Sequence, residues 1–175
     1  NIKKLAQHRC EKNVLIDAST AKSLEIFQTQ RGTREGSLLA FLDRAKTAAG
    51  SRLIQQFLIN PLIDLEQIRY RQACIQAFYE ASMATHSLQY ALGRTRDLTR
   101  ILSRLHNRLR SPRELGAIRE TLEQLPEIKA ILSQLKAPAL ERLTRSIELF
   151  EDLKRLLNEA LVSDLPNDLL EGGYI

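Results

Sequence analysis

GSLLAFLDRAKTAAGSRLIQQFLINPLIDLEQIRYRQACI, residues 36–75, is the stretch that decides the predicted fold. Thr47 can begin a helix that stops before Pro61, because a proline disfavours helical geometry in the residue before it. Asp64 with Gln67 forms a capping box for the next helix. That helix is expected to bury one apolar face, made of Leu65, Ile68, Ile75 and Tyr79. The stretch shows no evident nucleophile, metal ligand or phosphate-binding loop, and it is typical of a rigid framework.

Composition indicates an ordinary globular protein. The chain has 175 residues, of which 43% are hydrophobic and 27% are charged, enough for one domain or a domain with a small appendage. No apolar run is long enough to span a bilayer. We therefore expect no membrane partner. The two cysteines, Cys10 and Cys74, are far apart, so we expect a reduced, cytoplasmic setting. Because the chain starts at Asn1 rather than Met and stops abruptly at Ile175, we expect a fragment of a larger protein.

The N-terminal residues 1–36 differ from the rest and are expected to form a connecting segment. Residues 14–16 are β-favouring, and residues 24–27 alternate apolar and polar, as a short strand does. Asp17 can cap a helical turn between them. The predicted fold class is therefore mainly α, a multi-helix bundle with long lever-like helices and a small β-containing segment at the N-terminus.

Residues 37–162 are predicted to form a helical core or lever domain, and residues 163–175 an exit segment. One helix is expected from about Asp97 to Leu109. Ser111, Pro112 and Glu114 form the strongest helix start, and Pro126 should kink or end that helix. The longest apolar stripe predicts one helix about 30 Å long; its members are Leu140, Leu143, Ile147, Phe150, Leu153, Leu157 and Leu161.

The positive charge is concentrated in one segment. The formal net charge is +5, yet residues 94–113 hold seven arginines and one acid. Arg96, Arg100, Arg104 and Arg108 recur every four residues, which would place them on one helix face. They are the candidate weak contacts to DNA phosphates. The alternative is a solvated face, or arginines paired with acids of a neighbouring helix.

Residues that could carry chemistry are scarce. No GxxxxGK[ST] or GxGxxG motif is present, and no Ser/His/Asp or Cys/His grouping is suggested. We interpret Asp43, Asp64 and Asp97 as residues that cap helices. We therefore predict no catalytic, cofactor-binding or metal-binding residue, and this chain is not expected to be an enzyme.

Six motifs, in order and at matching spacing, resemble the core or lever region of the MutS family of DNA mismatch repair proteins. They are Leu15–Thr20 with Ser23–Ile26, Gly36–Leu39 with Leu42–Asp43 and Thr47–Leu62, Ile68–Ile75, Asp97–Leu105, Ser111–Leu115 with Leu125–Pro126, and Glu171–Ile175. Departures include Phe57, where the family usually has Trp. The resemblance covers about residues 14–175.

The resemblance implies a role within a larger protein. The parent would clamp mismatched duplex DNA, hydrolyse ATP with magnesium, and form a dimer. This region would link the recognition, clamp and ATPase modules and relay nucleotide state between them. A second interpretation stays open, an independent helical nucleic-acid-binding or adaptor module that uses the basic stripe from Arg94 to Arg113.

Overall fold

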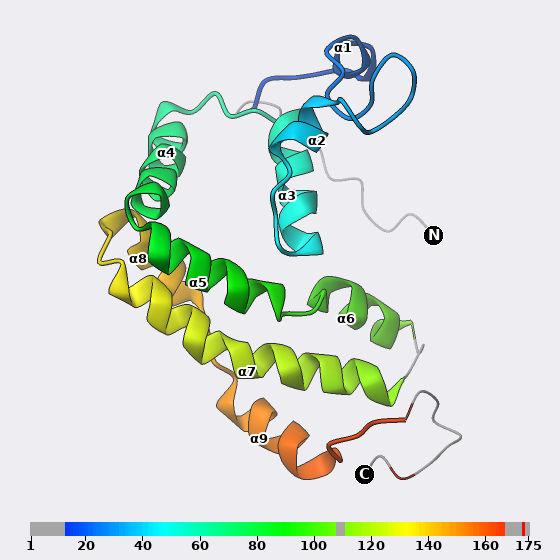
Figure 1. Cartoon of the computed structure of the whole chain (residues 1–175), viewed down its shortest axis with the longest axis vertical. Helices are drawn as coiled ribbons and strands as arrows, with labels where there is room; N and C mark the ends of the chain where they lie inside the picture. The colour runs from blue at the N-terminus through cyan, green and yellow to red at the C-terminus, as the bar shows by residue number, and fades with distance from the viewer. Residues whose placement is uncertain (1–12, 108–110, 167–172, 174–175) are drawn as a thin grey trace, which may run out of the picture. The chain divides into compact units, whose positions relative to one another are not determined.

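The computed structural model describes residues 13–107, 111–166 and 173. It divides into two compact units, residues 1–45 with 50–72 and residues 46–49 with 73–175. The described helices are α1 (Ala18–Ser23), α2 (Leu38–Leu42), α3 (Ala48–Ile59), α4 (Leu65–Glu80), α5 (Ser82–Gly93), α6 (Leu98–His106), α7 (Pro112–Gln134), α8 (Pro138–Ser146) and α9 (Glu151–Ala160) (Figure 1). The mainly α prediction is confirmed. The predicted boundaries after residues 36 and 162 stay predictions.

Helices α1 and α4 begin at the residues expected to cap them. Asp17 accepts the backbone N–H of Thr20 at 2.7 Å and begins α1. This hydrogen bond holds the pKa of the exposed Asp17 carboxyl below its usual range. Asp64 likewise accepts the N–H of Gln67 at 2.8 Å, at the start of α4. These caps are local, which explains why the sequence predicts them.

The two short strands predicted in residues 1–36 are absent from the part that the structure describes, residues 13–36. There the β structure is a single bridge between Asn13 and Leu62. Glu25 has a φ of 49°, outside the β region. The N–H of Ile26 turns back to the carbonyl of Ala21 at 3.0 Å and buries the Ile26 side chain. The alternating pattern therefore marks a turn that buries one apolar residue.

The expected buried face of α4 is also not formed. Leu65, Ile75 and Tyr79 are exposed, and Ile68 is only partly buried. Within the first unit, the α4 residue Arg71 places its guanidinium 3.6 Å from the ring centroid of Phe57 on α3. A cation over an aromatic face is attracted by the ring's electrons. The contact between α3 and α4 is therefore partly cationic, rather than formed by the predicted apolar stripe.

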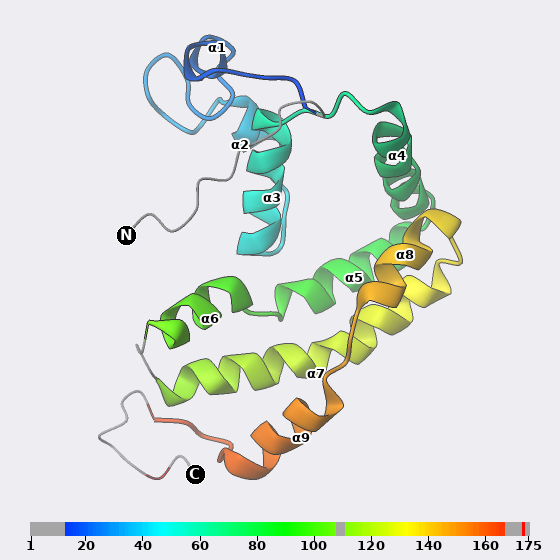
Figure 2. The same ribbon diagram turned by 180° about the vertical axis from the view of Figure 1, so that it is seen from behind.

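Helix α7 is the central element of the second unit. It has 23 residues, about 35 Å at 1.5 Å per residue, and it packs against α5, α6, α8 and α9. Figures 1 and 2 show α5 and α6 following one another along its length. Two buried clusters lie on it. The first is Leu88, Ala91, Ile128, Ile131 and Leu132, and the second is Leu122, Leu157 and Leu161.

Pro126 lies inside α7 and does not end it. Leu122 before it and Ile128 after it belong to different buried clusters, one packed against α9 and one against α5. A proline in a helix interior costs about 3 kcal/mol, and burial of several large side chains offsets a cost of that size. Tertiary packing therefore stabilises a continuous α7 despite the proline in its interior.

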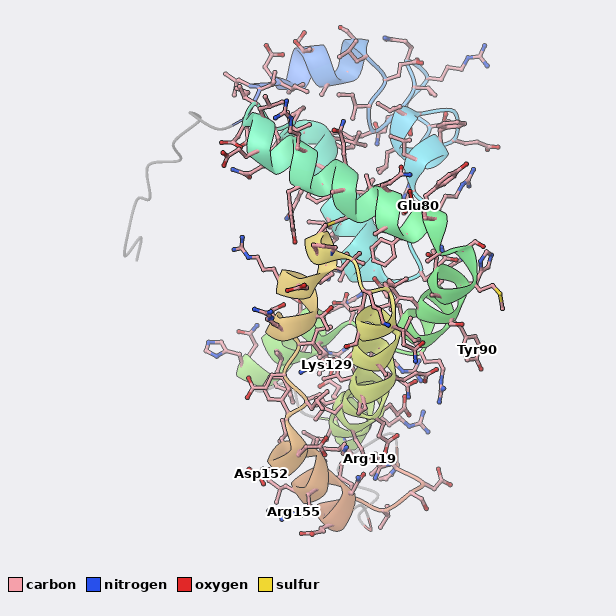
Figure 3. The ribbon with its side chains drawn as sticks, turned by 90° about the vertical axis from the view of Figure 1, so that its left-hand side faces the viewer. Glu80, Tyr90, Arg119, Lys129, Asp152 and Arg155 are labelled. Atoms are coloured by element: carbon pink, nitrogen blue, oxygen red, sulfur yellow. The ribbon has the colours of Figure 1, made fainter. Side chains whose placement is uncertain are left out.

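The single long helix predicted over residues 140–161 is wrong. The chain forms α8 and α9, separated by residues 147–150. Lys129, labelled in Figure 3, extends from α7, and its Nζ donates to the carbonyl oxygen of Ile147 at 2.8 Å. Phe150 takes a left-handed conformation with φ of 50°. A left-handed residue cannot continue a right-handed helix, so the apolar stripe is divided between two helices.

Within the described part of the chain, no helix combines the length and the apolar character needed to cross a membrane. The cytoplasmic location stays a prediction.

Candidate functional site

The three arginines of the predicted stripe that the structure describes do not lie on one helix. Arg100 and Arg104 lie on α6, whereas Arg96 precedes the cap residue Asp97 and lies outside the helix. Arg108 lies outside the described residues. The helix begins where the sequence predicts, because Asp97 is its cap and accepts the N–H of Arg100 at 3.4 Å, so Arg96 precedes the helix.

Three arginines of residues 94–104 form ion pairs with acids of α7. Arg94 pairs with Glu127 at 3.8 Å, Arg96 with Glu120 at 2.8 Å, and Arg104 with Glu114 at 2.7 Å. The acids run in reverse order because the α5–α6 segment lies antiparallel to α7. Arg100 is exposed, and no ion pair of the described residues includes it. This arrangement is the neighbouring-helix alternative drawn from the sequence.

The three pairs differ in burial. The side chains of Arg96 and Glu120 are 58% and 50% exposed, but that of Glu114 is only 11% exposed. Oε2 of Glu114 is buried without a hydrogen-bond partner among the described residues. The helix start predicted at Ser111, Pro112 and Glu114 keeps its proline in the first turn, but the Ser111 side chain makes no capping hydrogen bond. Glu114 pairs with Arg104 instead. A buried carboxylate needs such a partner far more than an exposed one does.

These ion pairs weaken the ability of the arginines to bind a DNA phosphate. A guanidinium already bonded to a carboxylate must release it, or share its donors, before it binds another anion. Each pair also cancels one positive charge of the patch. Weak DNA contact through Arg96, Arg100, Arg104 and Arg108 stays a prediction, and the geometry favours a structural use of Arg96 and Arg104.

A second arginine cluster, which the sequence analysis missed, holds the chain that follows α9. Arg119, labelled in Figure 3, donates from Nη1 to the carbonyl oxygens of Leu161 and Val162 at 3.1 and 3.2 Å. Arg113 donates from Nε to the carbonyl of Leu165 at 3.2 Å. The missing Cβ of Gly116 makes room for the Leu165 side chain. No local spacing signals contacts more than 40 residues apart.

This cluster surrounds a cavity of about 450 Å³ that also includes Glu120 and Asp164. Residues 163–165 form part of its wall, where acids and arginines are mixed, so the arginines serve to hold this segment against α7. Among the described residues, no group of three or more His, Cys, Asp or Glu side chains is placed to hold a metal ion. The expectations about catalysis and cofactors stay predictions.

Comparison with known proteins agrees with the motifs quoted from the sequence. The family model for MutS domain III matches residues 19–175. The chain is 35% identical over 169 residues to the DNA mismatch repair protein MutS of Exiguobacterium sp., 36% over 176 residues to that of Rhodopirellula baltica, and 39% over 160 residues to that of Paracoccus denitrificans. These matches cover 96%, 100% and 91% of this chain but 20%, 20% and 18% of the relatives. The chain therefore spans about a fifth of the length of the curated relatives it matches.

Proposed function

The chain belongs to the MutS domain III family, and from this premise we propose that it is the lever domain of a DNA mismatch repair ATPase. Its role would be to relay nucleotide state between the ATPase and the modules that recognise a mismatch and clamp DNA. The observation that carries this proposal is α7, one continuous helix with a separate buried cluster on each side of Pro126.

A relay element must move as a body, and α7 has the packing for it. Leu122, Ile128 and Leu132 are each at most 5% exposed. Close-packed interiors transmit a displacement instead of absorbing it, and packed helices tend to switch between discrete arrangements. The antiparallel ion pairs along α7 add directional contacts to the same helix. A displacement of one end of α7 would therefore be transmitted to its other end.

The activities of the whole protein belong to the same proposal. The parent would bind mismatched duplex DNA, hydrolyse ATP with magnesium, and act as a dimer in the cytoplasm. We propose that this domain contributes no catalytic group and that it contacts the other domains of the parent rather than the ligands themselves. The paired state of Arg96 and Arg104 supports this interpretation over an independent nucleic-acid-binding module.

The test is to change the stiffness of α7 and its packing in the full-length parent. Pro126→Ala restores a backbone donor and should stiffen the helix, whereas Leu157→Ala loosens the contact between α9 and α7. We expect both variants to alter the rate at which ATP releases the parent from mismatched DNA, with mismatch affinity and basal ATP hydrolysis retained. Stopped-flow fluorescence with a labelled duplex measures that rate.

Glu159→Ala is the matched control, because it changes an exposed residue of the same helix as Leu157. It should leave the release rate unchanged. If Pro126→Ala and Leu157→Ala also release DNA at the unaltered rate, while thermal unfolding shows that their stability has changed, the relay role is refuted.

A further inference from the structure

The first unit contains a cavity that the relay role does not use. It has a volume of about 540 Å³ and lies between α1, residues 27–32 and the end of α3. Figure 1 shows the looped chain after α1 folding back beside that helix. Volumes of 300–1,000 Å³ are typical of ligand sites in proteins.

The apolar part of the cavity lining, here called its floor, consists partly of small side chains. Ala18 and Ala21 contribute from α1, and Phe27 and Ile59 complete the floor. Alanine methyl groups leave space that larger side chains would fill. An apolar group entering this space would be removed from water, which is favourable in proportion to the area buried.

Residues 28–32 also line the cavity, and this segment, here called its wall, is held by its own hydrogen bonds. The N–H of Thr29 donates to the carbonyl of Thr33, and the N–H of Gly32 to that of Thr29, both at 2.8 Å. Gly32 has a φ of +77°, which favours glycine over any residue with a side chain. The N–H of Gln30 donates to Oε1 of Glu25 at 2.6 Å. The wall is therefore a built feature of the fold that does not depend on a ligand.

The charged residues that line the cavity have one sign. Lys22 and Arg31 are among its lining residues, both are exposed, and no ion pair of the described residues includes either of them. No lining residue is acidic. Two acids lie near the lining residues, and each accepts a backbone N–H, Glu25 from Gln30 and Asp17 from Thr20. The cavity thus combines an apolar part of its lining with two exposed cations, which is complementary to a ligand that is apolar in the middle and acidic at its edges.

We propose that this cavity binds an acidic peptide segment, whose apolar side chain enters between α1 and residues 27–32 while flanking carboxylates pair with Lys22 and Arg31. Duplex DNA fits less well, because its backbone needs a series of cations and gains nothing from an apolar floor. The inference does not rest on the relay role, since it concerns contacts within the first unit alone.

The test uses the 175-residue chain labelled with nitrogen-15 and the hexapeptide Asp-Glu-Phe-Leu-Glu-Asp. Amide shift changes in heteronuclear NMR spectra should saturate and be confined to residues 18–33 and 56–60. The neutral peptide Asn-Gln-Phe-Leu-Gln-Asn should bind at least about fivefold more weakly, because it lacks the carboxylates. Asp-Glu-Ser-Gly-Glu-Asp, which lacks the apolar centre, should also bind more weakly.

Charge reversal at the rim locates the contact. Lys22→Glu and Arg31→Glu should each weaken peptide binding by about three- to tenfold. Lys46→Glu reverses an exposed charge that does not line the cavity, so it should have no effect. Equal binding of the acidic and neutral peptides would overturn the proposal. So would displacement of the peptide by a short duplex, or the absence of saturable shifts at millimolar peptide.

Discussion

Two ion pairs of nearly equal length should differ in their coupling energy, because they differ in burial. Arg104 and Glu114 lie 2.7 Å apart, and Arg96 and Glu120 lie 2.8 Å apart, but Glu114 is 11% exposed and Glu120 is 50% exposed. An exposed pair contributes about 0.2–1 kcal/mol. A hydrogen bond to a charged, mostly buried group contributes about 1.5–3 kcal/mol. We expect coupling energies of about 2 kcal/mol for the first pair and about 0.5 kcal/mol for the second.

Two double-mutant cycles measure these couplings. Each arginine and each glutamate is replaced by alanine, singly and together, and the free energy of unfolding is taken from urea titrations followed by circular dichroism. Both pairs lie in the second unit and both acids are on α7, so the two cycles are compared in one unfolding assay. Arg104→Ala alone should lower the free energy of unfolding by about 2–3 kcal/mol, because it leaves the mostly buried Glu114 carboxylate without its cationic partner.

Salt provides an independent check on the same reasoning. At about 0.5 M NaCl the coupling between Arg96 and Glu120 should almost vanish, because exposed charges are screened, while that between Arg104 and Glu114 should keep more than half of its value. Equal couplings in the two cycles, or a larger one for Glu120, would refute the argument that burial sets the strength of these pairs.

Four further outcomes are expected. Lys136→Gly, at the left-handed position after α7, should raise the free energy of unfolding by about 1 kcal/mol, measured by urea unfolding; a loss of stability would contradict it. Gly93→Ala should stabilise the chain by about 0.4–1 kcal/mol, because nothing lies near its added Cβ. Gly116→Ala should give no such gain, because Leu165 must move to make room for the new Cβ. Thermal unfolding of the two variants measures this difference. Leu122→Ala, at a side chain 3% exposed, should cost about 2–5 kcal/mol in the same urea assay. The Asp17 carboxyl should titrate by NMR below the usual 3.8; because its pKa is lowered by folding, its contribution to stability is present above that value and disappears as the pH falls through the folded pKa.

The sequence predicted what depends on neighbours along the chain. The caps at Asp17 and Asp64 join residues three positions apart, so their spacing alone reveals them. The six motifs shared with the MutS family also lie in the sequence itself, and they led to the family that the comparisons show. The sequence analysis found the concentration of arginines at residues 94–113 but left open what they contact.

Other features were decided only by the tertiary structure. The apolar stripe of residues 140–161 has the same period whether the helix is continuous or broken, and the observed break includes a hydrogen bond from Lys129 on another helix. Likewise, α7 passes through Pro126 because buried clusters on both sides support it.

The same division holds for the candidate site. The sequence determined that arginines are plentiful in one segment and that α7 begins near Pro112, because composition and the fit of proline to the first turn of a helix are local properties. Only the fold determined that Arg104 meets Glu114, that Arg119 holds the carbonyls of Leu161 and Val162, and that an apolar cavity opens beside Lys22. These contacts join residues 10 to more than 40 positions apart, and their partners are selected by the burial of apolar surface and the satisfaction of buried charge, which no local pattern encodes.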